Sequence, residues 1–185
     1  MLKRSVRADH GERTRRLPGD DIVRDPIATV THAITIRRPP REVWPWLAQM
    51  GAGRAGWYSY DVIDNGGRPS ADRIAPELQR VNTGMLFPAV PGASDAFFVL
   101  RCEPERALVL GWLPEPGGIP ITTWALVLEE LEPGRTRLIE RGRVRSPYRP
   151  YGLPEWIAKR LAPVAHAVMV RKHLLGIARR AETRG

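Results

Sequence analysis

The chain has 185 residues, 43% of them hydrophobic, which is typical of one globular domain. Its single cysteine excludes a disulfide within the chain and sites built from several thiolates, such as zinc fingers and ordinary iron–sulfur clusters. The sequence holds no apolar run near the ~20 residues of a membrane span, and its first residues lack the apolar core of a secretory signal. We therefore expect a cytoplasmic location.

The formal net charge is +9, from 29 Lys and Arg against 20 Asp and Glu. The basic residues concentrate in three stretches, Lys3–Arg16, Arg135–Arg149 and Arg171–Arg184. A surplus of this size favours loose contact with polyanions or anionic membranes, and a solvated surface is the simpler interpretation. We expect no specific nucleic-acid partner and at most weak contact with anionic surfaces.

The first elements are predicted in chain order from charge and periodicity. Residues 1–26 are interpreted as an N-terminal arm, because they carry many charges and little apolar periodicity. Period-two alternation with β-branched residues predicts a strand over Ala28–Ile36. Two prolines follow, and a short helix is predicted over Arg41–Met50. We place one domain over residues 27–183.

The rest of the chain predicts a loop, an antiparallel meander and one long helix. Glycines and aromatic residues indicate a loop over Gly51–Gly67, and a capping residue suggests a helical turn over Ser70–Leu78. Alternation and Pro-Gly turn signals then predict four strands, over 97–102, 107–113, 121–131 and 136–145. A helix is expected over 154–182. This order predicts an α+β fold, a sheet with the helix laid across one face.

The long helix carries two apolar flanks. The first has apolar residues at intervals of three or four, with one skipped turn, and is expected to pack against the sheet. It consists of Ile157, Leu161, Val164, Val168 and Leu175. The second flank consists of Trp156, Val170, Leu174 and Ile177.

Two motifs are weighed and set aside. Gly51–Gly56 matches the pattern G-x-G-x-x-G, but a dinucleotide site needs a strand before the motif and a helix after it. Here a helix precedes the motif and an aromatic loop follows, so we expect no nucleotide. His166 and His173 stand about 10 Å apart along a helix and cannot share one metal ion. No cofactor and no metal are therefore expected.

The last predicted strand has two unlike faces. Arginines alternate along one face, with Arg141 and Arg143 among them, and that face is expected to be wet. Glu140 lies on the other face with Leu138 and Gly142, so it is predicted to point toward the long helix. A carboxylate there is costly unless it is paired. It could be a polar anchor or a general acid or base in a pocket, or one member of a structural ion pair.

Six tryptophans are many for a small core. Aromatic side chains with polar tips line cavities well, because the ring packs while the tip orients a ligand; ordinary core packing is the alternative. Catalytic residues stay unassigned. The candidate ligand-binding residues are Trp57, Tyr58, Tyr60, Asp61, Trp112, Trp124 and Glu140.

Three segments, Thr31–Leu47, Gln49–Asp61 and Met169–Ile177, carry a family resemblance. The first resembles the opening strand and helix of the START-like, or SRPBCC, superfamily, and the others are similar to an uncharacterised bacterial branch of it. The resemblance implies a helix-grip fold, in which a curved antiparallel sheet wraps around a long C-terminal helix with a cavity between them. Members bind lipids, sterols or polyketides, and some catalyse cyclisation or dehydration.

The resemblance transfers a fold and a cavity but no catalytic set. The expected function is binding of a small hydrophobic or aromatic molecule. The alternative is a cyclase- or dehydratase-type enzyme, with Glu140 or Asp61 as proton acceptor and Tyr58 or Tyr60 holding an enolate oxygen. A module that binds RNA or a protein through the basic surface is a third possibility, which high salt would weaken.

Overall fold

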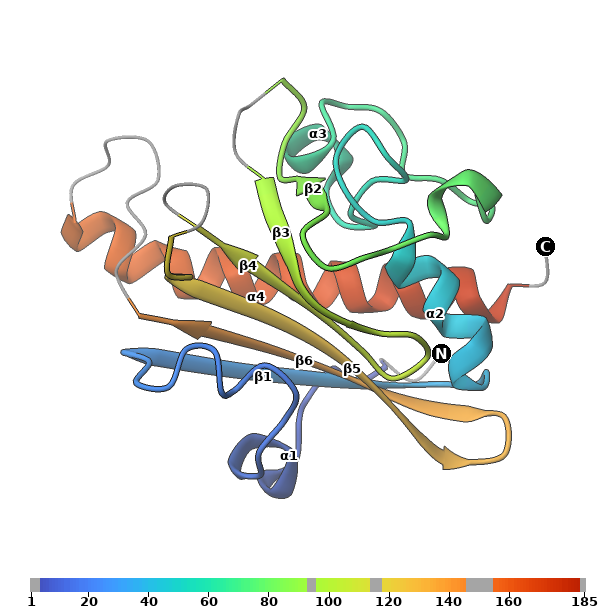
Figure 1. The fold of residues 1–185 in the computed structure, drawn as a ribbon, viewed down its shortest axis with the longest axis horizontal. Coiled ribbons are helices and arrows are strands. Elements are labelled where there is room, and N and C mark those ends of the chain that lie inside the picture. The colour runs from blue at the N-terminus through green and yellow to red at the C-terminus, as the bar shows by residue number, and fades with distance from the viewer. Residues whose placement is uncertain (1–3, 93–95, 114–117, 146–154, 184–185) are drawn as a thin grey trace.

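The computed structural model describes residues 4–92, 96–113, 118–145 and 155–183, without the side chains of 155–163 and 165. Six antiparallel strands form one sheet in the order β1-β6-β5-β4-β3-β2, and α4 runs along one face of it (Figure 1). The elements are α1 (His10–Thr14), β1 (Ala28–Ile36), α2 (Pro40–Ala48), α3 (Asp61–Asp64), the 3-10 helix η1 (Pro76–Leu78), β2 (Leu86–Pro88), β3 (Ala96–Glu103), β4 (Ala107–Trp112), β5 (Thr122–Glu132), β6 (Arg135–Val144) and α4 (Glu155–Glu182).

The structure confirms the predicted α+β fold, a curved antiparallel sheet with a long C-terminal helix. The predicted strands and the two main helices match the observed ones to within about two residues. Three short elements, α1, α3 and β2, were not predicted, and α3 lies within the segment Gly51–Gly67 that was expected to be a loop. The helical turn expected over residues 70–78 is reduced to η1.

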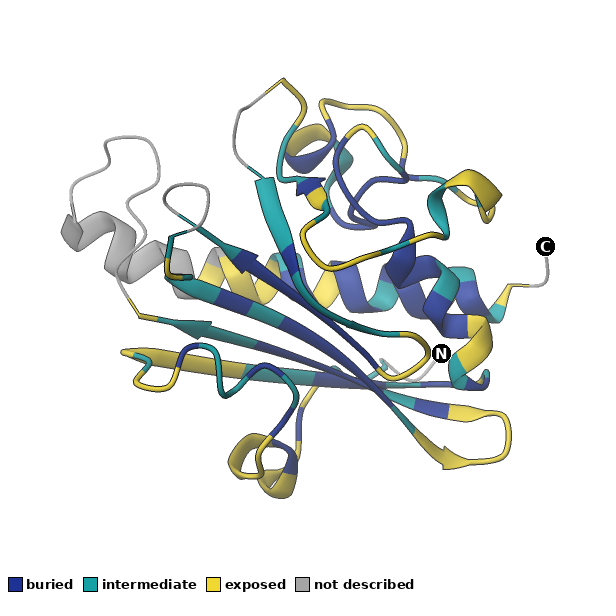
Figure 2. Ribbon diagram, viewed as in Figure 1, coloured by how far each residue is buried: buried dark blue, intermediate teal, exposed yellow. Residues whose placement is uncertain are grey.

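Side chains on the face of the sheet toward α4, here called the inner face, form the larger core with α2 and α4. In α4 the buried stripe is the second flank, with Val170, Leu174 and Ile177 all at 5% exposure or less. Figure 2 shows this burial along the C-terminal half of the helix. The expected packing of the first flank is wrong at Val164 and Val168, which are 63% and 48% exposed, whereas Leu175 is partly buried against the core. Leu161 lies outside the described side chains.

A close backbone approach fixes where α4 meets the loop after α2. A Cβ placed on Gly176 would collide with the backbone oxygen of Tyr58. Glycine lets the two backbones touch at this point, and any side chain would push the helix away. The helix is thereby held against the loop that contains Trp57 and Tyr58.

The N-terminal arm covers the opposite, outer face of the sheet (Figure 1). The expectation of a wet arginine face is wrong, because Arg141 is 2% exposed. Its guanidinium lies 2.6 Å from Asp20 and donates to the Glu12 carbonyl oxygen. Glu12 also pairs with Arg137 at 2.6 Å. The arm therefore supplies the carboxylates that let β6 bury its arginines.

The Gly51–Gly56 segment is a tight loop, closed by an antiparallel bridge between its two end glycines. Helix α2 precedes it, and no helix starts at Gly56. The geometry is not that of a dinucleotide-binding turn. No helix among the described residues is long and apolar enough to cross a membrane.

Replacing Asp20, one of the two carboxylates that the arm supplies to β6, should destabilise the protein. Asp20→Asn leaves the Arg141 charge in a dry site without its partner, so we expect the free energy of unfolding to fall by about 3 kcal/mol. The exposed pair of Arg135 and Glu132 provides the control, since Glu132→Gln should change the free energy of unfolding by less than about 0.5 kcal/mol. Urea denaturation measures both. Equal effects of the two substitutions would contradict a structural role for the arm.

Candidate functional site

Glu140 lies midway along β6 on the inner face, as the strand alternation predicts. Its direct cross-strand neighbours are His32 on β1 and Leu126 on β5. His173 of α4 faces it, and the Nε2 atom of His173 lies 3.9 Å from Oε2 of Glu140. Both residues are 3% exposed. An acid and an imidazole therefore meet in an otherwise apolar interior.

One backbone contact fixes the tautomer of His173. Its Nδ1 lies 2.5 Å from the carbonyl oxygen of Trp57. Because a carbonyl oxygen can only accept, Nδ1 carries the proton and donates it. The Nε2 lone pair then points away from the loop, toward Glu140, at a distance too long for a direct hydrogen bond.

Three buried polar atoms around this point have no hydrogen-bond partner: Oε2 of Glu140, Nε2 of His173 and the indole nitrogen Nε1 of Trp124. We call these three residues the polar anchor. Trp124 stands on β5 and its ring lies 5.3 Å from the imidazole of His173. Unpaired buried polar atoms are rare in native proteins, and each costs about 1–3 kcal/mol. Three such atoms on neighbouring residues mark this part of the interior as a candidate site.

Burial keeps the polar anchor neutral. It raises the pKa of Glu140 to about 8, and the nearby Trp124 indole partly offsets this shift although it completes no well-formed hydrogen bond. Burial also lowers the pKa of His173 to about 4, against the opposing effect of the Trp57 carbonyl group. At pH 7 the acid is mainly protonated and the imidazole uncharged.

Four aromatic rings, here called the aromatic wall, form a cluster that shares Trp124 with the polar anchor. Trp57 and Trp124 lie 5.3 Å apart, and Phe97 contacts Trp57, Trp112 and Trp124 at 5.5–5.7 Å. The indole N–H of Trp57 donates to the Ala89 carbonyl oxygen at 2.9 Å. Trp57 is thereby fixed, while Phe97, Trp112 and Trp124 are only partly buried. The aromatic wall is therefore partly exposed to solvent.

The structure places the other predicted site residues among different partners. Tyr58, which is buried, donates its hydroxyl to the Trp46 carbonyl oxygen at 3.1 Å. The Tyr60 ring lies 3.8 Å from the ammonium group of Lys172, and Asp61 accepts a hydrogen bond from the Ser70 hydroxyl. Each of these polar groups has a neighbour of its own. Their proposed part in ligand binding stays a prediction.

His173 and Phe97 were not singled out as site residues from the sequence. His173 does lie on the second apolar flank of the helix, three residues after Val170 and four before Ile177. A titratable residue inside an apolar stripe was the available signal. Phe97 carried no comparable signal, because an aromatic residue in a strand is most often core.

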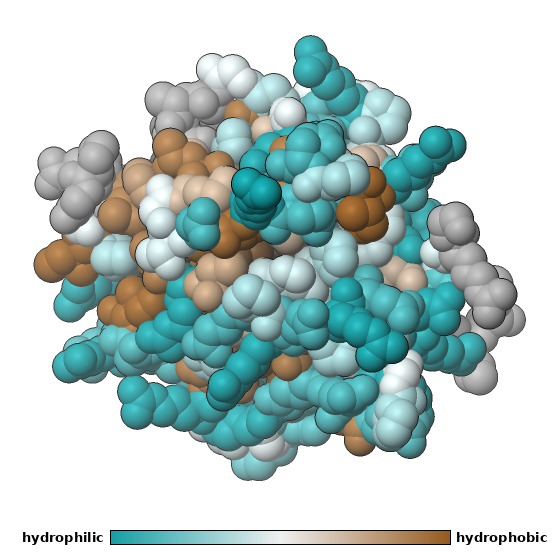
Figure 3. Space-filling model, turned by 45° about the vertical axis from the view of Figure 1, so that its right-hand side comes forward, coloured by the Kyte–Doolittle hydropathy of each residue, from teal (hydrophilic) through white to brown (hydrophobic). Residues whose placement is uncertain are grey.

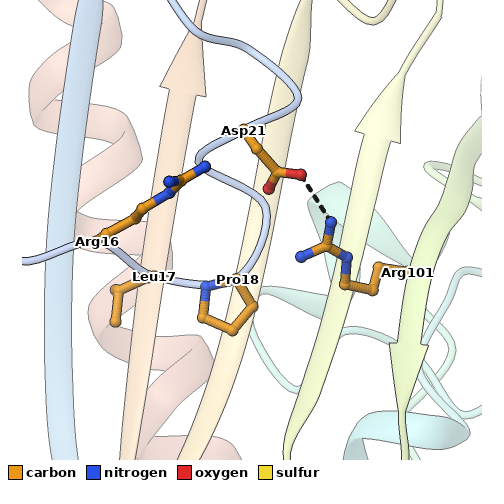
Figure 4. A pocket seen from close by; sticks show the side chains of 5 residues that line it. All are labelled: Arg16, Leu17, Pro18, Asp21 and Arg101. Carbon is orange, nitrogen blue, oxygen red and sulfur yellow. Dashed lines mark hydrogen bonds and ion pairs between the residues drawn. The ribbon is translucent and has the colours of Figure 1, made fainter.

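Two shallow hollows lie on the outer face, each of about 350 Å³ or slightly less. In Figure 4, Asp21 points toward Arg101, and an ion pair of 2.8 Å joins these two residues, which both line one hollow. Their charged linings are unsuited to a hydrophobic molecule. The cavity predicted under α4 stays a prediction, because the side chains of residues 155–163 lie outside the description. No described group of three His, Cys, Asp or Glu residues could hold a metal ion.

Ionisation of Glu140 should make stability depend on pH. Its pKa is about 8 in the folded protein against 4.5 for an ordinary Glu, so the folded form holds the extra proton between these values. Stability from this group therefore falls as pH rises through that window. Glu140→Gln lacks this loss. Between about pH 5.5 and about pH 8.5, the free energy of unfolding of this variant should therefore rise by roughly 3 kcal/mol relative to that of the wild type.

Urea denaturation at the two pH values measures this gain. Glu132→Gln, which alters an exposed carboxylate, should show no comparable gain. Wild-type and Glu140→Gln curves that stay parallel would mean that Glu140 titrates as an ordinary glutamate.

No protein-family model matches the chain, and no curated protein matches it. Solved structures do. A protein from Nitrosospira multiformis is similar over 84% of this chain and 97% of its own, with 11% identity and a TM-score of 0.50. CalU16 from Micromonospora echinospora has 18% identity over 83% of this chain and 81% of its own, with a TM-score of 0.46. The Polyketide_cyc-like protein Cgl2372 from Corynebacterium glutamicum has 17% identity over 82% and 89%, with a TM-score of 0.44. The chain has a helix-grip fold, a curved antiparallel sheet with a long C-terminal helix along one face.

Proposed function

We propose that the protein binds a small hydrophobic or aromatic molecule between the inner face of the sheet and α4. The observation that carries this proposal is the polar anchor, three unpaired buried polar atoms beside an aromatic wall. A site of mostly apolar lining with a few convergent polar groups is the usual design of a small-molecule pocket. Glu140, His173 and Trp124 would hold the polar group of the ligand, and the aromatic wall its apolar body.

Exposed apolar side chains near this region support a route of entry. Val164 and Val168 of α4 are exposed, and so is Val30 of β1, which lies opposite Gly142. The ring of His166 lies 6.2 Å from that of His32 on β1, so this part of the helix stands over the same strand. Figure 3 shows apolar side chains gathered on one side of the molecule. Such patches often border binding sites.

A second candidate function rests on the same pair of residues. A carboxylic acid with a pKa of about 8 beside a neutral imidazole could donate a proton to a bound substrate or remove one. This favours the cyclase- or dehydratase-type alternative with Glu140 and His173 as the acid–base pair. Asp61 and Tyr58 are engaged elsewhere. The binding function predicts that the ligand is released unchanged, and the enzymatic function that it is converted.

The expected location and partners stay proposals as well. We propose a cytoplasmic protein without a specific nucleic-acid partner. In support, Arg137 and Arg141 of the basic stretch are used in internal ion pairs with the arm. Weak contact with anionic surfaces would be lost at moderate salt.

Native mass spectrometry of protein purified from its own host tests the binding proposal. The wild type should carry a small organic molecule. Gly142→Leu should lower its occupancy about tenfold, because Gly142 faces inward beside Glu140 and a Cβ there meets only Val30, at 3.5 Å. Glu130→Leu adds the same side chain at an exposed position of β5 and is the control. A wild type without any bound molecule, or equal occupancy in all three proteins, would contradict the proposal.

A further inference from the structure

We infer that the polar anchor selects an apolar molecule that carries a hydroxyl group, an inference that rests on the proposed binding function. The three unpaired atoms are not alike. Nε2 of His173 can only accept, the indole N–H of Trp124 can only donate, and the protonated Glu140 carboxyl can do either. The complement to such a set is a single atom that both accepts and donates.

The spacing suits one oxygen atom. Oε2 of Glu140 and Nε2 of His173 are 3.9 Å apart, and an oxygen placed between them can lie about 2.8 Å from each. A hydroxyl oxygen in that place accepts from the Glu140 carboxyl and donates its own proton to His173. These two atoms are too far apart to form a hydrogen bond with each other, and close enough for both to bond to one ligand oxygen. The same oxygen has a second lone pair for the Trp124 N–H.

Other polar groups leave part of the anchor unpaired. A ketone or an ether oxygen accepts from Glu140 or Trp124 but gives nothing to His173, whose acceptor atom stays buried and unsatisfied. A carboxylate also lacks a donor, and it brings a charge into a site without a cation to pair it. A purely apolar ligand satisfies none of the three atoms. Discrimination therefore favours alcohols, phenols and enols over ethers, ketones and carboxylates.

Four probes with one ring system isolate this selectivity: 2-naphthol, 2-methoxynaphthalene, naphthalene and 2-naphthoate. Their dissociation constants can be measured by quenching of tryptophan fluorescence at about pH 6.5, where Glu140 holds its proton. We expect 2-naphthol to bind at least about tenfold more tightly than its methyl ether, the difference of one unpaired buried acceptor. Binding of 2-naphthoate should be the weakest.

Two variants assign the selectivity to the anchor. His173→Phe removes the acceptor and should bring 2-naphthol and its methyl ether to within about twofold of each other, as should Trp124→Phe in part. Glu132→Gln should keep the wild-type ratio. If His173→Phe does not fold, the four probes on the wild type still test whether the site prefers a hydroxyl group.

The outcomes separate the inference from the function it rests on. Equal affinity for 2-naphthol, its ether and naphthalene would overturn the hydroxyl selectivity and leave the binding function standing. Tightest binding of 2-naphthoate would overturn it as well, since the inference predicts that this probe binds most weakly. Failure of all four probes to bind would count against the binding function and the inference together.

Discussion

The middle of strand β6 is covered on both faces, so each ionisable side chain buried there needs a partner from another element or must give up its charge. On the outer face Arg137 and Arg141 keep their charge, because Glu12 and Asp20 of the arm reach them. On the inner face the described residue that faces Glu140 is the neutral His173, and the carboxyl stays protonated. The cost of burying a charge on this strand is thus met in two ways. Ion pairs offset it on the outer face, and protonation of the carboxyl removes it on the inner face.

The buried carboxyl of Glu140 lowers the stability of the fold. An amide or an apolar residue at position 140 would avoid the desolvation that raises the pKa of this carboxyl. Groups held in costly environments concentrate at functional sites. The unpaired atoms of His173 and Trp124 stand next to the same carboxyl, so one occupant would satisfy all three. The fold places them between the closed half of the core and the partly exposed aromatic wall.

Local patterns predicted most of the fold, because strand alternation and turn residues act over a few neighbouring positions. They also predicted that Glu140 faces α4. They could not show that the arginine face is buried, since its partners Glu12 and Asp20 lie more than 100 residues away in sequence. The choice between the two flanks of α4 was equally non-local, because it depends on the close contact of Gly176 with the loop at Tyr58. His173 was missed for the same reason: its importance comes from Glu140 across the interface.

The neutral carboxyl of Glu140 at the centre of the interior is the claim on which the site depends. Infrared difference spectroscopy of the wild type against Glu140→Gln at about pH 6.5 tests it most directly, since a protonated carboxyl absorbs apart from carboxylates. The account predicts one carboxylic-acid band that is lost in the variant and that disappears in the wild type above about pH 8. A difference spectrum showing only the loss of a carboxylate at about pH 6.5 would contradict it.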